Sequence, residues 1–235
     1  MASFYDELNT LLTTYVKVPG SKLNITRLRE CLQSVSTEEV YQLLTTVRNG
    51  RCTAIHIAAI RDHPEVITCL LDSVTSEQRY QLLRIQEMLG WTALHSAAYR
   101  GYTKALMCIR NSVTAEQRYQ LLTIQANNGY TPLHYAAVGG YTELITHILD
   151  SVEPAQQIQL LDITDNENRT VLDEALEENN QSTADFIKQY YQRDITSAGG
   201  KNSDTFIIFY LFHYHFTYFV IILPIHSLLL LLSRD

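Results

Sequence analysis

The sequence predicts an all-α solenoid, that is, a row of stacked helix pairs, and two observations support this fold class. First, a Thr-x-x-His motif followed by a pair of small residues recurs with a period of 39 residues. Second, the apolar residues after each motif are spaced by three and four positions, as on one face of a helix. One such unit cannot bury its apolar face alone, so the copies must stack. The motifs begin at Thr53, Thr92 and Thr131, with a degenerate copy at Thr170.

Each copy is expected to hold two helices. The Thr hydroxyl can accept a hydrogen bond from a free backbone N–H and so begin the first helix. In the third copy the second helix has Leu144, Ile145, Ile148 and Leu149 on one face. Shortly before each Thr stands a residue that suits a turn with positive φ. These residues are Gly50, Gly90, Gly129 and Asn168.

The third copy resembles the ankyrin repeat most clearly, because it contains the series Gly129-Tyr130-Thr131-Pro132-Leu133-His134-Tyr135-Ala136-Ala137. The resemblance covers about residues 24–192. It implies an ankyrin-type solenoid of stacked helix pairs that binds proteins. It also implies that the motif histidine is a structural residue, hydrogen-bonded to backbone.

The copies are longer than the usual ankyrin unit of about 33 residues. The additional residues follow the second helix, where a Ser or Thr precedes Glu-Gln and a Tyr-x-Leu-Leu stripe. This pattern is typical of a capped short helix, so an extra short helix per repeat is predicted. In this respect the chain resembles ankyrin proteins of intracellular bacteria. The segments concerned are 34–44, 73–83, 112–122 and, as a variant, 151–161.

The period divides the chain into seven predicted parts. The fourth copy is expected to cap the solenoid, because Asp173 replaces the motif histidine and an acidic stretch follows. An acidic docking face for a basic partner is the alternative for this stretch. The parts are an N-terminal half-repeat and cap (1–50), three repeats (51–89, 90–128 and 129–167), a degenerate capping repeat (168–195), a linker (196–204) and a hydrophobic segment (205–233).

Composition excludes some classes of partner. The net charge is −7 and the pI is about 5.6, which argues against a nucleic-acid partner, since phosphate binding needs clustered Lys and Arg. The four cysteines form no Cys-x-x-Cys pair, and no signal peptide is recognisable at the N-terminus. A reducing compartment is therefore expected.

We expect no catalytic, cofactor-binding or metal site, and no small-molecule substrate. The sequence has no nucleophile elbow, phosphate loop or His-Glu-x-x-His motif. The motif histidines His56, His95 and His134 should lie about 10 Å apart in stacked copies. Zinc ligands must instead converge to about 2.0–2.1 Å from one ion.

A concave surface for an unidentified protein partner is predicted at the turn tips and first helices, the parts through which the resemblance implies binding. The position before the motif threonine is assigned to Arg51, Trp91, Tyr130 and Arg169, and Trp, Tyr and Arg are the residue types that dominate binding hot spots. An alternative is that Trp91 and Tyr130 only pack across adjacent turns. The remaining candidates, at the ends of first helices, are Arg61, Tyr99 and Arg100.

The last part of the chain differs in composition. Residues 206–232 contain no Asp, Glu, Lys or Arg over 27 positions, which is long enough for a transmembrane helix in a lipid bilayer. Two alternatives stay open: a frameshifted or degraded end, and a buried helix that closes the solenoid.

Two functions remain in competition. One is a non-enzymatic protein-interaction scaffold tethered by a single-pass C-terminal anchor, with its repeats in the cytosol. The other is a soluble effector or adaptor in the cytoplasm of a bacterium or a host cell. In that case the hydrophobic tail is an artefact or a contact surface.

Overall fold

The computed structural model describes residues 25–45 and 52–197. Every regular element in these ranges is a helix, as the sequence predicts. The helices are α2 (Ile25–Gln33), α3 (Thr37–Thr45), α4 (Ala54–Ile60), α5 (Pro64–Asp72), α6 (Ser76–Arg84), α7 (Ala93–Tyr99), α8 (Thr103–Asn111), α9 (Ala115–Leu122), α10 (Pro132–Val138), α11 (Thr142–Leu149), α12 (Pro154–Leu161), α13 (Val171–Glu177) and α14 (Gln181–Ser197).

The chain divides into two units after Lys188, within α14. Of the second unit the structure describes only residues 189–197, which are helical. All packing discussed below lies in the first unit.

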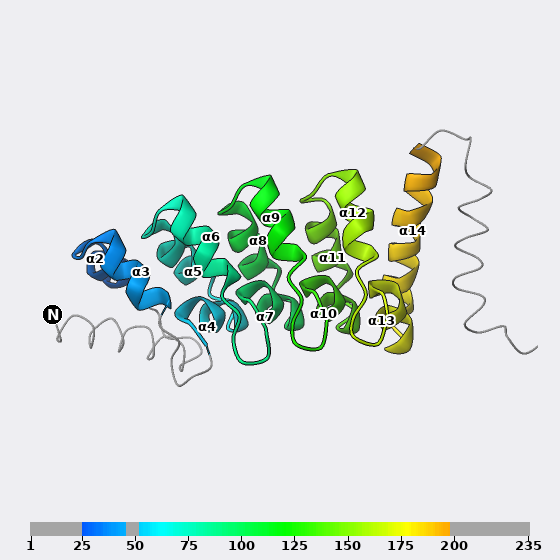
Figure 1. Ribbon diagram of the computed structural model, residues 1–235, viewed down its shortest axis with the longest axis horizontal. Coiled ribbons are helices and arrows are strands. Elements are labelled where there is room, and N and C mark those ends of the chain that lie inside the picture. Colours follow the sequence, from blue (N-terminus) through cyan, green and yellow to red (C-terminus); the bar gives the residue numbers. More distant parts are fainter. Residues whose placement is uncertain (1–24, 46–51, 198–235) are drawn as a thin grey trace, which may run out of the picture. The chain divides into compact units, whose positions relative to one another are not determined.

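Three of the described copies contain three helices each, and like helices stack on like (Figure 1). The first helices α4, α7, α10 and α13 contact one another in turn, and α5 packs against α8 and α8 against α11. The small Ala58-Ala59, Ala97-Ala98 and Ala136-Ala137 pairs are almost completely buried. Because their side chains are short, neighbouring first helices approach closely, and the core continues from copy to copy.

The predicted extra helix is confirmed as α6 and α9, and its predicted cap as well. The Thr75 hydroxyl accepts a hydrogen bond from the backbone N–H of Gln78, and the Gln78 side chain accepts one from the backbone N–H of Thr75. Thr114 and Gln117 repeat this reciprocal pair. Two otherwise unsatisfied N–H groups are thereby bonded at each helix start.

The extra helices also bond one copy to the next. Arg79 donates from Nε to the carbonyl of Leu71 in its own copy at 3.0 Å, and from Nη1 to the carbonyl of Ser112 in the next copy at 3.1 Å. One residue later, the Tyr80 hydroxyl donates to the Gln120 side chain. The same two bonds recur 39 residues on, from Arg118 and Tyr119. The lengthened unit therefore adds contacts between copies as well as surface.

In α12 of the third copy and in the fourth copy, the positions of the bridging arginine, the tyrosine and the motif histidine keep bonds within a copy but lack the donors that reach the next copy. Asp173 Oδ2 accepts from the backbone N–H and the hydroxyl of Thr170 at 2.8 and 2.7 Å, as the histidine Nδ1 does elsewhere, but Asp has no second donor atom. In α12, Gln157 replaces the arginine and bonds only to the carbonyl of Leu149, at 3.0 Å. Ile158 stands in the tyrosine position. These replacements fit the predicted capping role.

The hydrophobic segment 206–232 lies outside the described residues. Among the residues that the structure does describe, no helix is both long enough and apolar enough to cross a bilayer.

Candidate protein-binding surface

The loops before α7, α10 and α13 are named here the α7 tip (86–91), the α10 tip (125–130) and the α13 tip (164–169). Hydrogen bonds place the three tips side by side. The backbone N–H of Asn127 donates to the carbonyl of Leu89 at 3.0 Å, and its side chain donates to the carbonyl of Met88 at 3.0 Å. Asn166 repeats this bridge toward the α10 tip. The tips therefore form one continuous edge.

Two glycines permit this close stacking. Gly90 and Gly129 have φ values of +77° and +85°, which is the positive φ predicted from the sequence. A Cβ atom on Gly129 would lie 2.5 Å from the backbone nitrogen of Asn166. Asn168 takes the corresponding conformation in the α13 tip, with φ +61°. Gly50 lies outside the described residues.

The motif histidines attach each tip to the preceding first helix. His95 Nε2 lies 3.1 Å from the carbonyl oxygen of Tyr130, and its Nδ1 lies 2.8 Å from the Thr92 hydroxyl. A carbonyl can only accept, so Nε2 carries the proton and Nδ1 accepts from the Thr. Burial lowers the pKa of His95 to about 4, which keeps this neutral form. His56 and His134 make equivalent bonds, so the structural role implied by the resemblance fits the geometry.

An aromatic cluster joins the α7 tip to α7 and α10. The Trp91 ring centroid lies 5.0 Å from that of Tyr99 and 4.8 Å from that of Tyr135. Trp91 Nε1 also donates to the Tyr135 hydroxyl at 2.8 Å. Tyr99 is 46% exposed, and the Arg100 guanidinium lies 5.6 Å from its ring centroid. Trp91 is therefore held in place by Tyr135, whereas Tyr99 and Arg100 are open to solvent.

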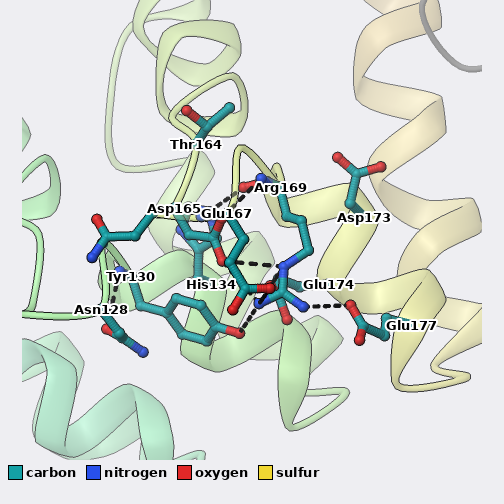
Figure 2. A network of polar contacts seen from close by, with 12 residues as sticks. Asn128, Tyr130, His134, Thr164, Asp165, Glu167, Arg169, Asp173, Glu174 and Glu177 are labelled. Carbon is teal, nitrogen blue, oxygen red and sulfur yellow. Dashed lines mark hydrogen bonds and ion pairs between the residues drawn. The ribbon is translucent and has the colours of Figure 1, made fainter. Parts of the chain in front are cut away.

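Tyr130 links this cluster to a charged network at the α13 tip (Figure 2). Its ring stacks on His134 with centroids 5.4 Å apart, and its hydroxyl accepts from Arg169 Nη2 at 3.4 Å. The Arg169 guanidinium also bonds to Asp165 at 3.0 Å and to Glu177 at 2.6 Å. Aromatic and charged side chains therefore form one connected strip across three copies.

Two carboxylates of this network are almost completely buried. The Asp165 side chain is only 1% exposed and that of Glu174 only 2%. Arg169 Nε lies 2.9 Å from Glu174 Oε1, but its N–H is directed at Asp165, so the contact with Glu174 is ionic without a hydrogen bond. Burial raises the pKa of Glu174 in spite of Arg169 and Tyr130.

The pKa values of Asp165 and Tyr130, which belong to the same network, are shifted by the same contacts. Burial alone would raise the pKa of Asp165, but hydrogen bonds from the backbone and side chain of Arg169 lower it instead. Burial also raises the pKa of Tyr130, and the Glu174 carboxylate adds to this effect. Arg169 is consequently the cation that lowers the pKa of Asp165 and opposes the rise in the pKa of Glu174.

The candidate residues named from the sequence have different positions. Trp91, Tyr99 and Tyr130 belong to the aromatic cluster, since Tyr135 contacts all three, and Arg100 stacks on Tyr99. Trp91 and Tyr130 thus also pack across adjacent turns. The remaining two candidates are Arg61, which is exposed just after α4, and Arg51, which lies outside the described residues.

One assignment of register needs correction. The period of 39 places Cys52, not Arg51, in register with Trp91 and Tyr130, because the first motif has one more residue between its glycine and its threonine. Sequence reasoning also missed two contributors to the surface, Tyr135 and the network around Arg169. Tyr135 occupies the variable position after the motif histidine, which is Ser96 in the preceding copy.

In the part of the chain that the structure describes, the titratable side chains form no arrangement typical of a metal site. Within residues 25–45 and 52–197, no group of three or more His, Cys, Asp or Glu is placed to hold an ion.

The family model for ankyrin repeats matches residues 28–115 and 109–198, with three copies. No curated protein matches the sequence significantly.

Proposed function

The chain belongs to the ankyrin-repeat family, and on this premise we propose that it is a non-enzymatic scaffold that binds a protein partner. The binding surface consists of the three tips and the C-terminal ends of α7, α10 and α13, together named here the tip face. Its anchors are Trp91, Tyr99, Arg100 and Tyr130, with Arg61 at the neighbouring copy.

The observation that carries this proposal is the fixed but accessible aromatic cluster. Tyr99 is about half exposed, although Trp91 beneath it is anchored to Tyr135 by a hydrogen bond. A side chain already held in one position loses little conformational entropy when a partner binds. Aromatic residues and arginine are also the types that contribute most to interface affinity.

A matched pair of double variants tests the proposal. Arg84 lies 5.5 Å from the ring centroid of Tyr80 on α6, so this pair resembles Arg100 and Tyr99 but belongs to an extra helix. The full chain and the two variants Y99A/R100A and Y80A/R84A would be used to capture proteins from the native host cell, with quantitative mass spectrometry.

The proposal expects captured proteins that are lost with Y99A/R100A and retained with Y80A/R84A. Equal retention by both variants would contradict a binding role for the tip face. Thermal unfolding of each variant shows whether a loss of capture reflects a loss of fold.

A membrane tether is a second element of the proposal. Its support is the run of 27 uncharged residues at 206–232. In the full chain, Ile221→Arg with Ile222→Arg should abolish resistance to alkaline carbonate extraction, because charges in a bilayer core are costly. Ser203→Arg with Asp204→Arg, in the linker, is the control and should stay in the membrane. Extraction of the wild-type chain would favour the soluble effector or adaptor.

A further inference from the structure

Equivalent positions on the tip face change in chemistry from copy to copy. In two copies the residue before the motif Thr contacts the residue eight positions later, at the end of the first helix. In the second copy this pair is Trp91 and Tyr99, with ring centroids 5.0 Å apart. In the fourth copy it is Arg169 and Glu177, with Nη1 and Oε2 2.6 Å apart. The same structural position is therefore aromatic at one end and ionic at the other.

The end of the tip face at α7 is apolar. Met88 and Leu89 in the α7 tip are 61% and 55% exposed, and Tyr99 is 46% exposed. They are three of the four large hydrophobic side chains that are exposed among the described residues. The corresponding tip residues of the next copy are Asn127 and Asn128. Exposed apolar residues gathered in one copy indicate a contact site.

The opposite end of the tip face, at α13, is acidic. Among the residues that the structure describes, Arg169 is the only cation in contact with Asp165, Glu167, Glu174 and Glu177. The guanidinium is held by Asp165 and Glu174, which are buried, whereas the side chains of Glu167 and Glu177 are 72% and 57% exposed. One positive charge against four carboxylates leaves this end with excess negative charge toward solvent.

We infer, on the basis of the proposed function, that the partner segment is an extended peptide with an apolar side chain and a basic one. The apolar side chain packs on Met88, Leu89 and Tyr99, and the Lys or Arg pairs with Glu167 and Glu177. Neighbouring packed helices are about 8–10 Å apart, so two copies span about 16–20 Å. An extended chain rises about 3.3 Å per residue, which separates the two side chains by about five or six residues.

The sign of the charge decides the class of partner. Phosphate groups would be repelled by the carboxylates at the α13 end, so nucleic acid does not fit this surface. A basic side chain of the peptide is attracted by the two carboxylates of Glu167 and Glu177. The apolar side chain of the same peptide excludes water from the aromatic cluster. The distance between the two ends gives the segment a defined register.

Selection from a random peptide-display library on the full chain tests this inference. Peptides of about twelve residues are long enough to span the two ends. Enriched peptides should share an aromatic or aliphatic residue and a Lys or Arg at the stated spacing. Fluorescence polarisation of a selected peptide then gives its Kd for each variant.

Two charge variants distinguish a local contribution of the carboxylates at α13 from a general effect of the net charge of the protein. Glu167→Gln with Glu177→Gln should weaken binding about tenfold at low salt, since the basic side chain of the peptide loses both exposed carboxylates with which it pairs. The fold is retained because Arg169 keeps Asp165 and Glu174. Glu77→Gln with Glu116→Gln removes the same charge from the extra helices α6 and α9 and should leave Kd unchanged.

The outcomes distinguish this inference from the proposed function. Enriched peptides that need Tyr99 and Arg100 but share no basic residue would overturn the inference. Equal Kd values for the two charge variants would do the same. In both cases the proposed scaffold function would still hold. If no enriched peptide depends on Tyr99 and Arg100, both the inference and the proposed function fail.

Discussion

Nη1 of Arg118 donates a hydrogen bond of 2.7 Å to the backbone carbonyl of Ser151 in the following copy. The same guanidinium donates from Nε to the carbonyl of Arg110 in its own copy at 3.1 Å. One side chain therefore satisfies carbonyls at the ends of two successive second helices, which lack partners within those helices. Its counterpart Arg79 does the same one copy earlier.

Arg118→Gln should lower the free energy of unfolding by roughly 2 kcal/mol, because a hydrogen bond from a charged group to a part-buried carbonyl is lost. Gln157 shows that glutamine at this position keeps the bond within the copy. Urea unfolding measures the change. Arg84→Gln removes an exposed arginine that stacks on Tyr80 and should cost less than about 1 kcal/mol. Equal losses in the two variants would show that the bond between copies contributes nothing.

The cap of the fourth copy gives a second prediction. Asp173 accepts two hydrogen bonds from Thr170, at 2.8 and 2.7 Å, so Asp173→Ala leaves the start of α13 without its reciprocal cap. A loss of about 1–2 kcal/mol is expected. The substitution Glu178→Ala, at an exposed residue just after α13, is the control. Thermal unfolding would contradict the prediction if the two variants melted alike.

Much of the fold follows from the sequence because it depends on local patterns. The starts of α6 and α9 could be predicted from Thr75 and Thr114, since a capping box involves residues only three apart. The bonds that Arg79 and Arg118 make between copies could not, because their partners lie 33 residues away and depend on how the copies stack. A period shows which residues are equivalent without showing what they contact.

The residues of the tip face could be predicted only in part, because a local pattern shows positions in the motif but not contacts between copies. Trp91, Tyr99 and Tyr130 were identified from their positions in the motif. Tyr135 could not be predicted because its contacts with Trp91 and Tyr99 depend on how two copies stack. Arg51 follows Gly50 as Trp91 follows Gly90, but Cys52 stands between Arg51 and Thr53, so Arg51 is one position out of register. Register within a loop is less certain than register between helices.

The buried histidines predict a dependence of stability on pH. Burial lowers the pKa of His95 and of His134 to about 4, whereas an unfolded histidine has a pKa of about 6.5. As pH falls below about 6.5 the unfolded chain takes up protons and the folded chain does not. The free energy of unfolding should therefore be highest above pH 6.5 and decline toward pH 4.

Urea unfolding between pH 5 and pH 7 measures this decline, in a range where most carboxylates stay charged. His95→Gln should be less stable at pH 7 and should show a shallower slope, because one of the groups that bind a proton only on unfolding is gone. An unchanged slope in this variant would rule out His95 as a source of the effect.

The ion pair between Arg169 and Glu174 gives the last prediction. Arg169→Met leaves Asp165 and Glu174 buried without a cation, which should cost about 3–5 kcal/mol. Glu174→Gln in the same chain removes one of the two uncompensated charges. The double variant should then be more stable than Arg169→Met alone, although each single change is destabilising. A double-mutant cycle by urea unfolding measures this coupling, and strictly additive losses would show that the two side chains do not stabilise each other.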